Sequence, residues 1–285
     1  KAISIIENEE DSSKDLCKKI FPRTGKAYRI GITGPPGAGK STITLRITQN
    51  LIKSGFKVEI LAVDPTSPFT GGALLGDRVR MQELALEKNV FVRSMATRGS
   101  LGGLSKKTRD AADVLDASGM DIIIMETVGV GQSELDIAKA SDTTIVVLVP
   151  ESGDSIQAMK AGLMEIADIF VVNKADRDGA DEAVLAIKNM LELRVEKVGW
   201  EIPVHKTIAS TNQGIDEVVN SIFLHKDYLI SSNLLKKKRM DNLINMIHEI
   251  VSQELKINFW NEEKENYLSN KIENILTASF VFLIF

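Results

Sequence analysis

Short apolar runs alternate with longer amphipathic stretches along most of the chain. The runs are rich in isoleucine and valine and nearly continuous; they are Arg29–Thr33, Val58–Val63, Val90–Ser94, Asp121–Glu126, Thr143–Val149 and Ile169–Val172. Such runs are typical of strands buried on both faces, as in a parallel sheet covered by helices. The stretches between them predict helices at about 40–54, 77–88, 105–118, 133–140, 155–167 and 179–193. This alternation predicts an α/β fold with a doubly wound, mostly parallel sheet.

The pattern is different at the two ends of the chain. Residues 1–27 are polar and charged and form an N-terminal extension, helical or irregular. Beyond residue 225 the sequence reads as helix, with apolar side chains at three- and four-residue spacing; they include Leu234, Leu235, Met240, Leu243, Ile244, Ile247, Ile250, Val251 and Leu255. We therefore expect three parts: an extension at 1–27, an α/β domain at 28–225 and a helical arm at 226–285.

A glycine-rich segment follows the first predicted strand and precedes the first predicted helix. It reads Gly34-Pro35-Pro36-Gly37-Ala38-Gly39-Lys40-Ser41-Thr42, which has the spacing of a phosphate-binding loop. Gly37 and Gly39 let the backbone N–H groups turn toward a phosphate, and the positive end of the helix dipole adds to the attraction. Lys40 is expected to bridge the β- and γ-phosphates, and the Ser41 hydroxyl to ligate Mg²⁺. The sequence therefore predicts a P-loop nucleoside triphosphatase.

A second segment, Asn173-Lys174-Ala175-Asp176, directly follows the last of these apolar runs. The Asp176 carboxylate can accept two hydrogen bonds from the N1–H and N2–H₂ edge of guanine, whereas adenine offers no such pair of donors. We expect Asn173 to fix the neighbouring loops and the Lys174 stem to stack over the base. Ile208-Ala209-Ser210, further along the chain, gives a weaker indication of backbone contacts to the same base. The predicted nucleotide is GTP, or GDP after hydrolysis.

Two of the predicted strands end at acidic residues. Asp64 follows Val58–Val63, and Glu126 ends the strand that begins at Asp121. Carboxylates at the C-terminal edge of a parallel sheet face the phosphate site, where Mg²⁺ and its waters bind. The alternative for each acid is that it caps the following helix. Asp77 is a third candidate metal-side acid, and it fits the N-cap of a helix at 78–88 equally well.

The residues after Glu126 bear on hydrolysis. Gly129 is placed to donate its N–H to the γ-phosphate. The next residue is Val130, at a place where many GTPases use glutamine to orient the attacking water. A valine side chain cannot do so, which leaves Gln132 as the nearest amide candidate. We expect weak intrinsic GTPase activity that rises with a partner.

Composition and charge exclude several other classes of protein. The 285 residues contain 35 Lys+Arg and 39 Asp+Glu, for a net charge of -4, which argues against bulk binding to nucleic acid or anionic membranes. A single cysteine and three scattered histidines do not predict a Cys/His metal cluster. No apolar stretch approaches the ~20 residues of a membrane span, and the N-terminus lacks the features of a signal peptide. We expect a cytoplasmic protein, or a mitochondrial-matrix one if the source is eukaryotic.

The chain resembles the methylmalonyl-CoA mutase-associated GTPases, also called the LAO/AO transport ATPase family, over about 28–225. The shared stretches are Gly31–Thr42, Ala62–Ser67, Gly72–Arg80, Thr97–Leu104, Glu126–Glu134 and Val149–Asp176. The resemblance implies a Mg²⁺-dependent GTPase of the signal-recognition-particle-like class. It also implies a chaperone that gates cofactor loading of an adenosylcobalamin-dependent acyl-CoA mutase and protects that enzyme.

The resemblance assigns roles to the candidates already named. Gly34 to Thr42 match the phosphate loop, Asp176 the guanine contact, and Asp64, Asp77 and Glu126 the metal-side acids. It implies that the C-terminal helices pair two subunits; the alternative is that they pack back on the α/β domain. Phe280–Phe285 either lies buried in such a dimer or is an aggregation-prone end.

Other functions compete with this interpretation. A GTPase that inserts nickel would need a Cys/His ligand pair near the sheet edge, and Cys17 lies far in sequence from His205, His225 and His248. A transport-coupled ATPase or a kinase would need adenine binding, against which the segment from Asn173 to Asp176 argues. The discriminating observation is whether ATP competes equally with GTP.

Overall fold

The computed structural model describes residues 2–8, 12–65, 89–97, 103–127, 133–152, 161–193 and 199–282. Within them seven strands form one sheet, and all six strand pairings are parallel. The strands are β1 (Tyr28–Thr33), β2 (Val58–Pro65), β3 (Val90–Thr97), β4 (Ile122–Thr127), β5 (Thr143–Leu148), β6 (Ile169–Asn173) and β7 (Val204–Thr207). Their order across the sheet is β3-β2-β4-β1-β5-β6-β7. The predicted doubly wound α/β fold is confirmed.

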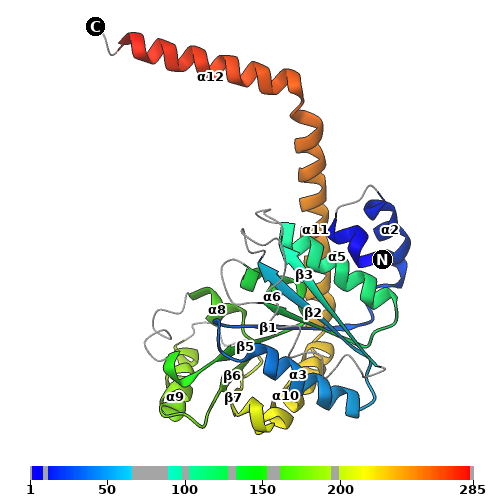
Figure 1. Ribbon diagram of the computed structural model, residues 1–285, viewed down its shortest axis with the longest axis vertical. Coiled ribbons are helices and arrows are strands. Elements are labelled where there is room, and N and C mark those ends of the chain that lie inside the picture. Colours follow the sequence, from blue (N-terminus) through cyan, green and yellow to red (C-terminus); the bar gives the residue numbers. More distant parts are fainter. Residues whose placement is uncertain are drawn as a thin grey trace. The chain divides into compact units, whose positions relative to one another are not determined.

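Helices connect most of the strands (Figure 1). They are α1 (Ala2–Glu7), α2 (Ser13–Ile20), α3 (Lys40–Lys53), α5 (Gly103–Ala117), α6 (Ser133–Ala140), α8 (Ala161–Ile166), α9 (Ala180–Glu192) and α10 (Ile215–Ser231), with α11 (Leu234–Phe259) and α12 (Glu262–Phe282) after the last strand. The helices expected near 40–54, 105–118, 133–140 and 179–193 are present. The helix expected at 77–88 lies outside the described residues, as does the first part of the one expected at 155–167.

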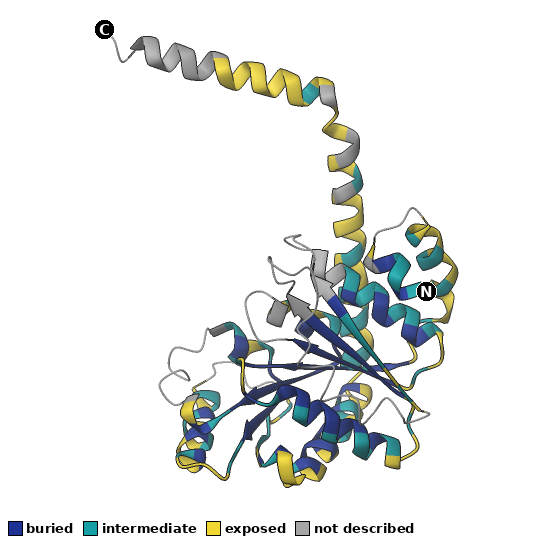
Figure 2. Cartoon of the chain, in the orientation of Figure 1, coloured by how far each residue is buried: buried dark blue, intermediate teal, exposed yellow. Residues whose placement is uncertain are grey.

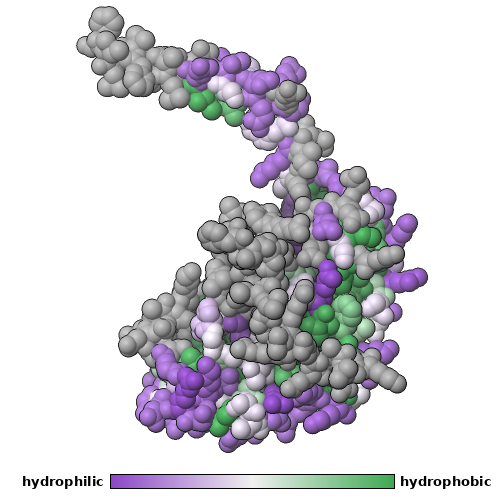
Figure 3. All heavy atoms as spheres, viewed as in Figure 1, coloured by the Kyte–Doolittle hydropathy of each residue, from purple (hydrophilic) through white to green (hydrophobic). Residues whose placement is uncertain are grey.

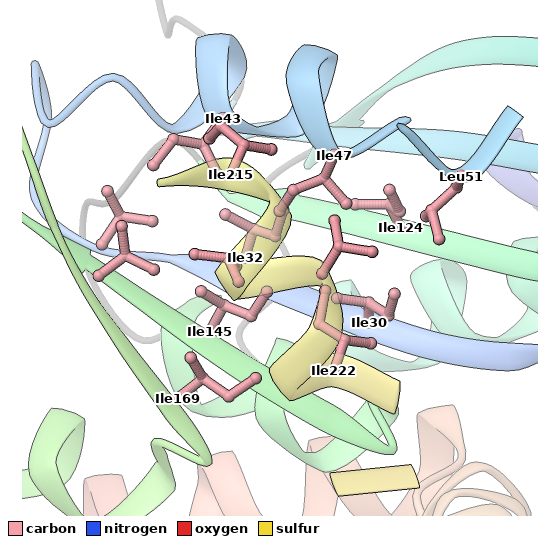
Figure 4. Close-up of a cluster of buried hydrophobic side chains, with 14 of the residues drawn as sticks. Ile30, Ile32, Ile43, Ile47, Leu51, Ile124, Ile145, Ile169, Ile215 and Ile222 are labelled. Carbon is pink, nitrogen blue, oxygen red and sulfur yellow. The ribbon is translucent and has the colours of Figure 1, made fainter. Parts of the chain in front are cut away.

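The sheet is buried on both faces. Helices α3 and α10 pack on one face against isoleucines of β1, β4, β5 and β6. Figure 4 labels side chains of this cluster from both the strands and the two helices. On the opposite face, α1, α5 and α6 cover β2 and β4, and α9 covers β5 and β6. Every residue of β4, β5 and β6 is buried, and the central strands are accordingly dark blue in Figure 2. Double-sided burial is why these strands have continuous apolar sequences.

The topology determines where a ligand can meet the sheet. Strand β1 lies between β4 and β5, so the chain leaves it toward one side for β2 and later crosses to the other side for β5. Ligands of open α/β sheets bind outside the C-terminal ends of the strands at such a switch point. Because the strands are parallel, the ends of β1, β4, β6 and β7 share that edge.

The described residues separate into two compact units, Lys1–Leu235 and Lys236–Phe285. Residue 226, where we expect the helical arm to begin, lies inside α10, which packs on the sheet through Val218, Val219 and Ile222. In the second unit many large apolar side chains are exposed; they include Met240, Ile244, Ile247, Val251, Leu255, Phe259, Trp260, Tyr267 and Ile272. Apolar side chains stand among polar ones along α12 in Figure 3. In the part of the chain that is described, no helix is long and apolar enough to span a membrane.

One of the buried acidic side chains of the first unit, Glu59, lies in a strand between apolar neighbours. Glu59 in β2 is 1% exposed and is paired in register with Phe91 and Ile123. Desolvation by burial raises its pKa from 4.5 to about 8. The folded protein therefore keeps a proton on Glu59 that the unfolded chain releases, so its stability falls as the pH rises from 4.5 to about 8.

We expect Glu59→Gln to weaken this pH dependence and to stabilise the protein at the upper end of the interval. The amide retains the shape of the protonated carboxyl and cannot ionise, so the gain is on the order of a few kcal/mol. Denaturant unfolding at several pH values across the interval measures the effect. Glu182→Gln, at an exposed position of α9, is the matched control. An unchanged pH slope in Glu59→Gln would contradict the prediction.

Candidate functional site

The phosphate loop joins β1 to α3 at the switch point of the sheet. Gly39 stands at the N-cap of α3 with φ 87°, in the left-handed region. A Cβ atom at Gly39 would lie 2.4 Å from Nδ2 of Asn173, so glycine is needed both for the backbone conformation and for the approach of Asn173. The first N–H groups of a fourteen-residue helix thus open toward the loop, where they attract an anion.

Lys40 folds back over this loop. Its Nζ donates to the carbonyl oxygens of Gly34 and Pro35, each at 2.9 Å, and the residue is only 6% exposed. An ammonium group held against the loop carbonyls is positioned beside the N–H groups of the helix end. This arrangement fits a positive charge held for a phosphate chain, and the contact of Lys40 with the β- and γ-phosphates stays a prediction.

The next residue of α3 contacts β4. Ser41 Oγ donates to Oε1 of Glu126 at 2.6 Å, and both residues are buried. A hydroxyl and a carboxylate in contact at the end of the phosphate loop are hard oxygen donors, the kind that Mg²⁺ prefers together with phosphate oxygens and water. Ser41 comes from the phosphate loop and Glu126 from the end of another strand, and the sequence predicts both as metal ligands. Their contact therefore fits a magnesium site.

The structure describes only part of the other predicted metal and catalytic residues. The backbone of Asp64 lies within β2 and pairs with Ala96 of β3, so the strand continues past the acid that we expected to follow it. Its side chain is outside the described part of the structure. Asp77, Gly129 and Gln132 also lie outside the described residues, and their roles stay predictions.

Asn173, the last residue of β6, links the phosphate loop to the segment after β7. Its Nδ2 donates to the carbonyl of Ala38 at 2.9 Å, and its Oδ1 accepts from the Thr207 hydroxyl and the Ala209 amide, each at 3.1 Å. Asn173 is 3% exposed, so each of these bonds is shielded from water. This is the loop-fixing role that the sequence predicts for Asn173.

Lys174 and Asp176 come next in the chain. Lys174 has φ 58°, which is uncommon for a residue other than glycine, and its Nζ donates to the carbonyl of Gly37 at 2.8 Å. The lysine stem therefore runs from the end of β6 to the phosphate loop. Asp176 is exposed in the turn before α9, which leaves its carboxylate open to a ligand.

The segment Ile208-Ala209-Ser210 lies at the same edge of the sheet. Residues Ala209–Thr211 form a 3₁₀ turn, and the Ala209 amide is the one bound by Asn173. The segment also has a partner that no sequence motif indicates, Arg46 of α3, which donates to the carbonyls of Ala209 and Ser210. Arg46 belongs to no motif, and its position six residues after Lys40 does not by itself indicate a role.

The class of protein is a P-loop nucleotide hydrolase. It is defined by the phosphate loop on a central parallel strand, the buried Ser–Glu pair beside that loop and the bonds of Asn173. Comparisons with known proteins identify the family. The methylmalonyl-CoA mutase-associated GTPase family MeaB matches residues 1–264. The chain belongs to this family and is a P-loop GTPase that binds guanine nucleotides.

Individual proteins agree with this assignment. A Pyrococcus abyssi protein is 53% identical over 253 residues, which are 88% of this chain and 78% of the relative. Escherichia coli GTPase ArgK is 38% identical over 261 residues, which are 90% of this chain and 78% of ArgK. The crystal structure of a LAO/AO transport system kinase superposes with a TM-score of 0.77 at 30% identity, covering 97% of this chain and 86% of that one.

Proposed function

We propose that this GTPase is a chaperone of an adenosylcobalamin-dependent acyl-CoA mutase of the methylmalonyl-CoA mutase type. In this role, GTP binding and hydrolysis gate loading of the cobalamin cofactor and protect the mutase from inactivation. The observation that carries the proposal is the match to the mutase-associated GTPase family over residues 1–264. The bonds from Asn173 to the phosphate loop and to Ala209 join two parts of the proposed nucleotide site, which supports the GTPase part of the proposal.

The nucleotide site of this proposal uses the residues described above. Lys40 and the N–H groups of the loop hold the phosphate chain, while Ser41 and Glu126 hold Mg²⁺, which supplies charge neutralisation of the phosphates when bound. Asp176 recognises the guanine edge, with backbone contacts from residues 208–210. Asp64, Asp77, Gly129 and Gln132 complete the metal and γ-phosphate side.

The second part of the proposal is that two copies of the chain pair through the helical unit 236–285. Many of its large apolar residues are exposed, and two copies would bury them against each other. In the proposed organisation, this unit belongs to a helical arm 226–285, which follows an N-terminal extension 1–27 and an α/β domain 28–225.

The test measures GTP turnover and mutase activation together. The isolated protein is expected to hydrolyse GTP well below the ~10 s⁻¹ that is common for enzymes, and a cobalamin-dependent mutase is expected to raise that rate. Loading of adenosylcobalamin onto the mutase is followed by absorbance with GTP, with GDP and without nucleotide.

Two outcomes would contradict the proposal. If loading and mutase inactivation are the same in all nucleotide states, the chaperone role fails and only the GTPase remains. If ATP competes equally with GTP, the guanine site fails as well, and a transport-coupled ATPase or a kinase becomes the better interpretation.

A further inference from the structure

The segment after β7 lies beyond the last paired residues of the sheet, Asn173 and Thr207. Strand β7 ends at Thr207, and beyond it an isolated antiparallel bridge joins Ile208 to Gln213. Within this small loop the 3₁₀ turn of Ala209–Thr211 is closed by local bonds, such as the one from the Thr211 amide to the Ile208 carbonyl at 3.0 Å. A short loop held by its own turn needs outside contacts to keep one position.

Arg46 supplies such contacts from the helix that follows the phosphate loop. Its Nε donates to the Ala209 carbonyl at 3.1 Å, and one terminal nitrogen donates to the Ser210 carbonyl at 3.3 Å. The other terminal nitrogen donates to Oε1 of Gln49 at 3.0 Å, which fixes the plane of the guanidinium. Arg46 is half-buried, so these bonds are partly shielded from water.

The contacts of Arg46 and Asn173 converge on one residue. Ala209 has its amide bound by Oδ1 of Asn173 and its carbonyl bound by Nε of Arg46, and it is 2% exposed. Asn173 also holds the phosphate loop through Ala38. One turn further along α3, Asn50 donates to Asp216 at the start of α10. Helix α3 therefore holds both this loop and the helix that follows it.

We infer that Arg46 is a positioning residue for guanine recognition. It places the backbone of Ala209 and Ser210 against the base while the same helix carries Lys40 and Ser41 to the phosphates. The inference rests on the proposed contact of residues 208–210 with guanine, and it adds a residue of α3 to that site. The guanidinium fork suits two successive carbonyls in a way that a lysine ammonium does not.

Arg46→Met is expected to raise the Kd values for GTP and for GDP by about tenfold, because charge-assisted bonds to two carbonyls are lost. The two nucleotides weaken together, since they share the base and differ only at the γ-phosphate. Nucleotide dissociation is expected to become faster, and KM to change more than kcat. The weak binding of ATP, which depends on the phosphate loop, changes little, so discrimination between GTP and ATP falls.

The experiment uses the full chain, with equilibrium binding and stopped-flow dissociation of GTP, GDP and ATP. Arg46→Lys keeps the positive charge but replaces the planar guanidinium by a single ammonium nitrogen, and is expected to recover part of the affinity. Lys53→Met is the matched control, because it removes a positive charge from the exposed end of the same helix. Thermal unfolding without nucleotide reports any general loosening of the fold.

The outcomes separate this inference from the proposed function. Suppose that the wild-type protein prefers GTP and that the Kd of Arg46→Met for GTP is within about twofold of the wild-type Kd. The inference is then wrong and the guanine site stands. If GTP and ATP weaken by the same factor, Arg46 has only a structural role and the inference is again wrong. If wild-type protein does not prefer GTP to ATP, the guanine site itself fails.

Discussion

Asp176→Asn is expected to reduce the affinity for GTP by about a hundredfold or more and to create affinity for xanthosine triphosphate. In the proposed site, the Asp176 carboxylate accepts two hydrogen bonds from N1–H and N2–H₂ of guanine. An asparagine in the same place keeps one acceptor and presents an N–H₂ group to the exocyclic amine of guanine, which also donates. Xanthine has a carbonyl where guanine has that amine, so the substituted side chain complements it.

The structure places Asp176 where this exchange can be tested cleanly. The residue is exposed in the turn after β6, and the backbone of the neighbouring Ala175 is held by a bond of 3.0 Å to the Thr207 carbonyl. Asparagine matches aspartate in size, so the turn can keep its shape. The loss of GTP affinity is therefore expected without a loss of stability.

Binding of GTP, XTP and ATP to the variant, followed by fluorescence or calorimetry, measures the effect. Asp178→Asn is the matched control, since it removes the same charge from an exposed position two residues away. A variant at Asp176 that behaves like the one at Asp178 would show that the carboxylate does not read the base.

The sequence predicted the parts of this site that follow strands directly. The phosphate loop begins one residue after β1 ends, and Asn173 is the last residue of β6, so strand prediction also placed these residues at one edge. The strands themselves can be predicted from the sequence because burial on both faces requires continuous apolar residues. Strand β7 is not among the six predicted runs. It lies at the edge of the sheet, His205 is partly exposed and Lys206 is exposed, so its sequence does not have to be continuously apolar.

The contacts between segments that lie far apart in the sequence could not be predicted from it. Arg46 and Ala209 are 163 positions apart, and the bond uses a backbone carbonyl, which leaves no preference for a residue type at 209. The hydroxyl of Ser41 was predicted to meet the metal, but its bond to Glu126 across 85 positions follows only from the packing of α3 beside β4. Motifs report local geometry, whereas these bonds depend on how the helices pack.

Gly34→Ala is expected to abolish tight nucleotide binding by a different route, through the backbone. Gly34 has φ 139°, and a Cβ atom there would lie 2.0 Å from the carbonyl oxygen of Val147 in β5. No change of rotamer relieves a collision between a Cβ and a neighbouring strand, so either β5 or the start of the loop must move. The Gly34 carbonyl also accepts a bond from Lys40, and a shift of the loop would carry the lysine with it.

A displacement of about 1 Å at such a site costs roughly a hundredfold in function, so the expected result is at least that loss in GTP affinity. Gly119→Ala is the matched control, because Gly119 has φ 92° and an added Cβ would meet nothing within 4 Å. It introduces left-handed strain of about 1–2 kcal/mol far from the loop. If both variants lose the same stability and both bind GTP normally, the collision with Val147 is relieved without moving the loop. If only Gly34→Ala loses binding, the close packing of the loop against β5 is what holds the phosphate site in place.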